Sequence, residues 1–159
     1  MRKQVVKTLA KVGLLSVMAM FMAVASAQGQ SLADGLKANI PFDFTVVDKQ
    51  MPAGEYSINR AQSTAGDAIL KISGVKQPAT VLSLTSSTQS IDPKTVGTLV
   101  FHRYGDQYFL FQVWPKGATY GREINKSRVE REVAQKARET VGAANRMTVE
   151  TVAVVVSSN

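Results

Sequence analysis

The residue types that most often carry out chemistry are scarce in this chain. It contains a single histidine, His102, and no cysteine. Histidine is the usual general base of acyl transfer, but His102 stands in the middle of a β-prone run, where a packed histidine is the more ordinary role. One histidine without a cysteine cannot build the common tetrahedral zinc site. We therefore predict a protein that is not an enzyme, with no catalytic residue, no metal site and no cofactor.

The acidic residues form no recognisable catalytic or calcium-binding pattern. Two carboxylates can hydrolyse a glycosidic bond, and Asp43 with Glu55 would be the pair if the first two strands formed a hairpin. Exposed acids on strands more often keep sheet edges from associating. The chain also lacks nucleophile-elbow, phosphate-loop and dinucleotide-binding motifs. The aspartates are scattered without the spacing of a calcium loop, at Asp34, Asp43, Asp48, Asp67, Asp92 and Asp106.

Aromatic and basic side chains offer a possible binding surface instead. Arg103 opposite Tyr108 is expected to form a cation–π pair, and Tyr104, Tyr108, Trp114 and Tyr120 could form an aromatic ligand surface. The basic residues of a late helix could contact an acidic partner or anionic lipid. Core packing and a solvated helix face are the alternatives. The candidate ligand or partner surface comprises His102, Tyr104, Phe109, Trp114, Arg128 and Arg131.

The first 27 residues have the pattern of a secretory signal peptide. Four basic residues without an acid precede an apolar stretch over residues 12–24, and Ala25 and Ala27 are the small residues that signal peptidase requires. The apolar stretch is shorter than the roughly 20 residues that span a bilayer. We predict cleavage after Ala27, no membrane span in the mature chain, and a periplasmic or secreted location. An uncleaved membrane anchor is the alternative.

Composition limits the mature chain to a small domain with an ordinary charge. The full chain has 19 basic and 12 acidic residues and a net charge of +7. Four of the basic residues lie in the signal segment, so the mature part carries +3, which does not indicate nucleic-acid binding. Without cysteine no disulfide can hold an exported fold, and the hydrophobic core must suffice. About 132 residues can bury such a core, and we predict one domain over residues 28–159.

Short β-prone runs separated by turn residues occupy residues 36–122. The first run, 37–47, places alternate apolar side chains on one face, and its Pro41 favours an edge strand. Later strands are expected over 55–60, 68–73 and 80–88. The apolar positions expected to face inward in these runs are Ile40, Phe42, Phe44, Val46, Tyr56, Ile58, Ile69 or Leu70, Leu82 and Leu84.

The strongest predicted element is a hairpin over residues 98–114 around the Gly105-Asp106 turn. A two-residue turn fixes the register, so Phe101 faces Leu110, His102 faces Phe109, and Val100 faces Phe111. Both faces are largely apolar, which places the hairpin centrally. Replacing either Phe101 or Phe111 by alanine is therefore expected to lower the free energy of unfolding by as much as the removal of an aromatic side chain from a hydrophobic core.

After the hairpin the period changes to that of a helix, expected over residues 127–141. Ser127 and Glu130 fit a capping box, and Gly142 suits the end of the helix. Its apolar stripe of Val129, Val133, Ala137 and Val141 is narrow, which indicates a surface helix. Residues 147–156 are expected to form a last strand. The fold class predicted is mainly β, an antiparallel β-sandwich or small barrel with one late surface α-helix, preceded by a signal peptide.

Four motifs together resemble a family of small exported bacterial proteins that carries no assigned activity. The motifs are IPFDFTV at 40–46, PAGEYSI at 52–58, LVFHRYGDQYFLFQVW at 99–114 and GREINKSRVERE at 121–132. The resemblance implies export and a compact β domain, and it transfers no functional residue.

The sequence therefore favours an exported, non-enzymatic structural or interaction module of the cell envelope, with an envelope protein as its partner. The alternative is a small-ligand carrier whose β-barrel encloses an apolar pocket near His102, Tyr104 and Phe109. Nucleic acid is not expected as a partner of either.

Overall fold

The computed structural model describes residues 35–61, 68–140 and 149–158. The predicted signal peptide, with Ala27, and the predicted helix end at Val141 and Gly142 lie outside these ranges. The described chain is mainly β with one late helix, α2 (Arg128–Thr140), as predicted. Its strands are β1 (Leu36–Ile40), β2 (Phe44–Val46), β3 (Lys49–Met51), β4 (Gly54–Arg60), β5 (Ile69–Gly74), β6 (Thr80–Gln89), β7 (Gly97–Tyr104), β8 (Gln107–Trp114), β9 (Tyr120–Ile124) and β10 (Glu150–Ser158).

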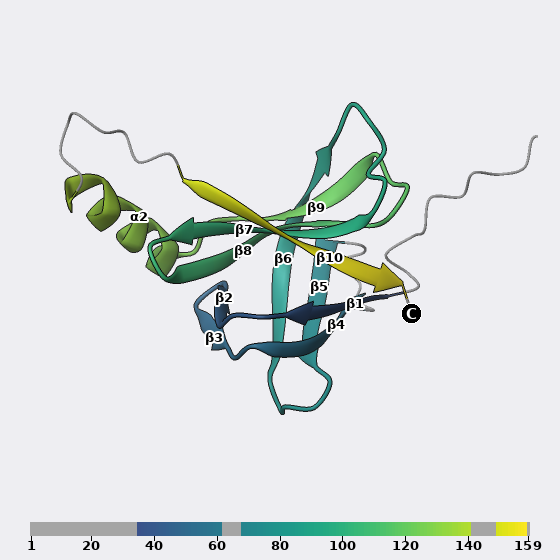
Figure 1. The fold of residues 1–159 in the computed structure, drawn as a ribbon, viewed down its shortest axis with the longest axis horizontal. Helices are drawn as coiled ribbons and strands as arrows, with labels where there is room; N and C mark the ends of the chain where they lie inside the picture. Colours follow the sequence, from purple (N-terminus) through teal and green to yellow (C-terminus); the bar gives the residue numbers. More distant parts are fainter. Residues whose placement is uncertain (1–34, 62–67, 141–148, 159) are drawn as a thin grey trace, which may run out of the picture.

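Eight of these strands close into an antiparallel barrel (Figure 1). The order around the barrel is β7, β10, β1, β4, β5, β6, β9 and β8, and pairing of β8 with β9 completes the circle. Of the two architectures that the sequence left open, sandwich and barrel, the chain adopts the barrel. The short β2–β3 hairpin extends the sheet from the first half of β8, where Thr45 pairs in parallel with Phe109.

Apolar side chains from the strands fill the barrel. Tyr56, Phe44 and Phe101 are the largest of the fully buried side chains. The ring of Phe44 meets those of Tyr56 and Phe101 edge-on, at centroid distances of 5.1 and 5.6 Å. The interior of an eight-stranded barrel is about as wide as side chains can fill. The barrel interior is therefore a packed hydrophobic core.

Pro41 follows the last residue of β1, and β1 is not an edge strand as its proline had suggested. β1 pairs with β10 on one side and β4 on the other, so the edge prediction was wrong. Proline has no N–H to donate to a ladder, and the next strand begins only at Phe44. The predicted alternation is nevertheless confirmed, because Ile40, Phe44 and Val46 are buried in the core and Phe42 packs against it.

The inward face predicted for β6 was wrong. Leu82 and Leu84 are 58% and 69% exposed, whereas Ser83 and Thr85 are buried. The hydroxyl of Thr85 donates to the carbonyl oxygen of Ala68 at 2.9 Å, and that of Ser83 donates to the carbonyl oxygen of Leu84 at 3.2 Å. Burial of a hydroxyl is inexpensive when it is hydrogen-bonded. In β6, therefore, the apolar side chains of the alternating pattern lie on the exposed face.

The hairpin of β7 and β8 forms with a bulge that the sequence did not predict. Phe101 faces Leu110 as expected, and the register holds toward the turn. Beyond that point Val100 faces Gln112 instead of Phe111. The extra residue in β8 leaves Phe111 and Gln112 both on the outer face, as a β-bulge does. Phe111 is consequently half-buried outside the barrel and does not belong to its core.

The helix and the last strand form close to their predicted bounds. Ser127 caps α2, since its Oγ accepts the backbone N–H of Glu130 at 3.1 Å. The predicted apolar stripe was wrong in part, because Val129 is 41% exposed while Glu130 and Ala134 are buried. β10 pairs with β7 and β1, which confirms a paired last strand. Figure 1 shows α2 beside the turn end of the β7–β8 hairpin.

Candidate functional site

Two residues of the predicted surface, His102 and Tyr104, meet on the outer face of β7 beneath α2. The Nδ1 atom of His102 lies 2.8 Å from Oε1 of Glu130, and the Tyr104 hydroxyl donates to the same oxygen at 3.2 Å. Lys126 Nζ donates to the Tyr104 oxygen at 3.0 Å. We call His102, Tyr104, Lys126 and Glu130 the β7–α2 clamp. It joins the barrel wall to the start of the helix.

Aromatic rings from β8 support the clamp. The ring of Phe111, brought outward by the bulge, stacks on His102 with centroids 4.0 Å apart and planes at 25°. Phe109 meets Tyr104 edge-on at 5.8 Å and, with it, packs against Ala134 of α2. Phe109 therefore also belongs to this region, as the sequence proposed. Tyr104, Phe109 and Ala134 form a second apolar cluster, smaller than the barrel core and outside the barrel.

Glu130 and Lys126 are the members of the clamp that the sequence did not predict, and Glu130 is the buried one. A capping box would turn its carboxylate back toward the residue that caps the helix. Its side chain instead turns to the barrel, where it is 4% exposed. A buried carboxylate needs hydrogen-bonding partners, and His102 and Tyr104 supply them. The spacing of Glu130, Ala134 and Ala137 places all three on one helix face, and that signal could have identified the buried glutamate.

The geometry indicates that the clamp holds α2 against the barrel and does not carry out catalysis. A histidine oriented by a carboxylate can act as a base when its free nitrogen meets a substrate. Here His102 is only 8% exposed and one face of its ring is covered by Phe111. Neither His102 nor Glu130 lines either of the surface hollows described below. The hydrogen bonds of the pair connect β7 to α2.

The environment of Tyr104 keeps its hydroxyl protonated. Burial is the main cause that raises the pKa of the Tyr104 phenol above its ordinary value of 10.0. The hydrogen bond from Lys126 acts in the opposite direction, and the charge of Glu130 adds to the rise. A protonated phenol can donate to the Glu130 carboxylate while accepting from Lys126. Tyr104 thus links both charged members of the clamp.

Trp114 lies at the other end of the hairpin from the clamp. It faces Thr98, whereas Tyr104 faces Gln107 beside the turn. The indole N–H of Trp114 donates to Gln112 Oε1 at 3.0 Å, and its ring lies against Gly121 of β9. The structure gives Trp114 packing contacts of its own and does not bring it to His102.

Arg128 and Arg131 are exposed on α2 and do not join the clamp. Arg128 Nε donates to Glu132 at 2.9 Å, and this hydrogen bond raises the pKa of the guanidinium. The exposed pair is an ordinary i,i+4 contact on a helix surface. Of the six predicted surface residues, the structure brings His102, Tyr104 and Phe109 together and leaves Trp114, Arg128 and Arg131 apart.

The predicted aromatic ligand surface does not form. The ring of Tyr108 stacks on Phe42, with centroids 3.9 Å apart. The guanidinium of Arg103 lies 5.5 Å from the Tyr108 ring centre, which confirms the predicted cation–π pair. Tyr120 is exposed on β9. The aromatic side chains thus pack in separate places.

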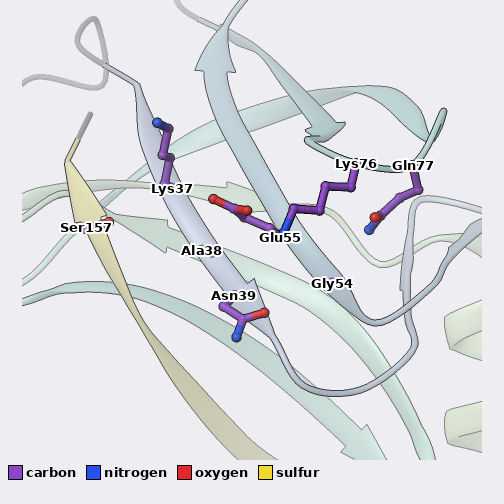
Figure 2. A pocket seen from close by; sticks show the side chains of 8 residues that line it. All are labelled: Lys37, Ala38, Asn39, Gly54, Glu55, Lys76, Gln77 and Ser157. Carbon is purple, nitrogen blue, oxygen red and sulfur yellow. The ribbon is translucent and has the colours of Figure 1, made fainter.

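Asp43 and Glu55, the acids considered as a catalytic pair, line two different surface hollows. Asp43 lines a hollow of about 470 Å³ beside the β7–β8 turn, and its Oδ1 accepts the backbone N–H of Ala53 at 2.7 Å. Glu55 lines another, of about 460 Å³, between β1, β4 and the turn after β5. Figure 2 shows Lys76 and Gln77 reaching from that turn toward β4. Asp43 and Glu55 therefore do not share a site.

The comparisons with known proteins add no assignment. Among residues 35–61, 68–140 and 149–158, no three His, Cys, Asp or Glu side chains gather as metal ligands would. Within the same ranges, no helix has the length and apolar character needed to cross a membrane. No protein-family model, curated protein or solved structure matches the chain. The resemblance to a family of small exported proteins therefore stays a prediction.

Proposed function

We propose that the chain is exported and that its barrel serves as a structural or interaction module of the cell envelope, without catalytic activity of its own. The observation that carries this proposal is the packed barrel interior, in which Phe44, Tyr56 and Phe101 are at most 1% exposed. Because side chains of the described strands fill the barrel, its interior leaves no room for a ligand, and a partner has to bind the outer surface. We therefore infer that the partners of this protein meet its outer surface.

The alternative function, a carrier of a small apolar ligand, is one that eight-stranded barrels can also serve. That hypothesis placed the ligand inside the barrel near His102, Tyr104 and Phe109. These three side chains lie on the outer side of the barrel wall, where Phe109 and Tyr104 pack against α2. The interaction module is preferred on this ground.

Export is supported by the N-terminal pattern of basic residues, apolar stretch and small residues at 25 and 27. The full chain, carrying a C-terminal tag and expressed in a bacterial host, is expected to yield a mature protein that begins at Gln28. N-terminal sequencing of the protein from the periplasm and the medium tests this. A full-length protein retained in the membrane would contradict export by cleavage.

The interaction role is tested by recovering the processed protein from the cells that make it, under mild crosslinking, and examining it by native mass spectrometry. We expect a complex with a second protein and no stoichiometric small molecule. A bound apolar small molecule would favour the carrier instead. A protein that is empty and monomeric under all conditions would count against both functions.

A further inference from the structure

The first half of β6 has an edge that no described strand covers. β5 pairs with residues 80–84 of β6, whereas β9 pairs only with residues 85–89. The barrel is thus closed along the second half of β6. Along the first half, among the described residues, the edge opposite β5 receives a side-chain contact, in which Lys49 Nζ of β3 donates to the carbonyl oxygen of Thr80 at 2.8 Å. We call residues 80–84 the open edge.

The backbone groups at the open edge can be assigned from the hydrogen-bond pattern. The carbonyl oxygen of Ala79 accepts the N–H of Gly74 at 2.7 Å, so Ala79 faces β5. In an antiparallel strand successive residues turn their backbone groups to opposite sides. Thr80, Leu82 and Leu84 therefore present their N–H and C=O groups away from β5. The contact of Lys49 with the Thr80 carbonyl agrees with this assignment.

Exposed leucines lie beside these backbone groups. Leu82 and Leu84 are 58% and 69% exposed, while Ser83 between them is buried. This half of β6 thus turns leucines outward and a hydroxyl inward, the reverse of an ordinary amphipathic strand. An unpaired edge with exposed apolar side chains readily pairs with another chain. Extended peptides that add to a sheet use the same two features, main-chain hydrogen bonds and alternate apolar contacts.

We propose that the open edge binds an extended segment of a partner protein, which adds to β6 as a further strand with apolar side chains at alternate positions. This inference rests on the proposed interaction module and names its binding surface. Lys49 is exposed at the edge itself, where its Nζ contacts the Thr80 carbonyl, and Lys71 is exposed on β5, across β6 from the edge and opposite Leu82. Charge complementarity therefore calls for an acidic residue in the partner segment.

An extended segment fits the open edge better than a second copy of the chain. Two open edges could pair around Leu82, but five residues with two leucines are a small contact compared with the roughly 1,200 Å² that stable dimers bury. Strand addition gains its affinity from main-chain hydrogen bonds, which a single segment can form in full. A short segment of a partner is accordingly the occupant we infer.

The probe for this surface is a phage-displayed library of random nine-residue peptides, selected on the whole mature protein that remains after cleavage of the signal peptide. Enriched peptides should carry apolar residues at alternate positions and an aspartate or glutamate. Leu82→Pro should weaken their binding by about tenfold or more, because it removes an N–H that faces the open edge. It leaves the hydrogen bonds to β5 in place, as proline at a strand edge can.

Further variants separate binding from folding. Circular dichroism and thermal melts show whether Leu82→Pro is folded, and a Leu82→Lys, Leu84→Lys double variant tests the same edge with an unchanged backbone. The matched control is Val155→Ala, since Val155 is 66% exposed but lies on β10, where it pairs with Thr98 of β7. This control should bind the selected peptides as the wild type does.

Four results would overturn the proposal. The first three are a selection that enriches no peptide, enriched peptides that still bind both edge variants, and a concentration-dependent dimer that the double variant abolishes. A native partner whose binding survives the double variant would also refute the open edge. That last result would leave the interaction module standing, so the two proposals can fail separately.

Discussion

The Nδ1 atom of His102 and the Oε1 atom of Glu130 lie 2.8 Å apart, in a contact that joins β7 to α2 and is almost fully buried. The apolar face of α2 is small, with Ala134 buried and Val133 and Ala137 only partly so. Such a face contributes little to holding a helix. The β7–α2 clamp therefore has a large share in keeping α2 on the barrel.

Removing the clamp carboxylate should release α2. Glu130→Ala leaves the His102 and Tyr104 groups without their acceptor, and we expect it to lower the free energy of unfolding by about 1–3 kcal/mol. Hydrogen exchange of the α2 amides should accelerate more than that of the barrel strands. Glu132→Ala, which removes the exposed pair with Arg128, should change stability by under roughly 0.5 kcal/mol. Equal effects of the two substitutions would refute the clamp.

Phe101 and Phe111 should differ in their contribution to stability. Phe101 is fully buried in the barrel core, so Phe101→Ala is expected to destabilise by about 3–5 kcal/mol. Phe111 is half-buried on the outer face, where it stacks on His102, and Phe111→Ala should cost only about 1–2 kcal/mol. Urea unfolding of both variants measures the difference. Equal losses would contradict the bulge in β8.

The raised pKa of Tyr104 predicts a dependence of stability on alkaline pH. Because the fold favours the neutral phenol, the stability that this group contributes is present below about pH 10 and is lost as the pH rises through its folded pKa. The wild type should therefore be more stable than Tyr104→Phe at pH 8, and the difference should shrink toward pH 11. Urea unfolding across this range measures it. A difference that does not change with pH would argue against a buried phenol.

Gly121 should be required for the packing of Trp114. A Cβ atom at Gly121 would lie 2.7 Å from the indole ring, so Gly121→Ala must displace it. We expect a loss of about 1–3 kcal/mol and a changed emission spectrum of the single tryptophan. Gly105→Asn is the control, because a Cβ at Gly105 meets no atom within 4 Å and asparagine tolerates positive φ. An unchanged spectrum in Gly121→Ala would contradict the contact.

Val47 should be a position where substitution stabilises the protein. It occupies the β2–β3 turn with φ of 59°, a conformation that is unfavourable for β-branched residues. Val47→Asn should raise the free energy of unfolding by about 1 kcal/mol, because asparagine adopts this conformation more easily. Val47→Ile keeps the branching and should give no gain. Thermal melts of the two variants decide, and a destabilised Val47→Asn would refute the strain.

Much of the fold could be predicted from local signals. Alternating apolar residues located most strands, the Gly105-Asp106 turn set the register of Phe101 opposite Leu110, and the cap at Ser127 marked the start of α2. The candidate site was predicted only in part. His102, Tyr104 and Phe109 were singled out, but their partner Glu130 was not, because it lies 28 residues from His102 along the chain.

What the sequence by itself determined is therefore most of the elements, since periodicity, turns and caps act between neighbouring residues. It did not predict β3 or β9, and the single run predicted over 37–47 forms two strands, β1 and β2. The tertiary structure decided which face is turned inward in β6 and α2, where the prediction from the pattern was wrong in whole or in part. It turned Leu82 and Leu84 outward while hydroxyls are buried in their place, and it brought Glu130 to His102. Both outcomes depend on how the barrel closes and on where α2 docks. Alternation favours burial of the apolar face, but it does not contain the contacts between distant strands that determine which face of β6 is covered.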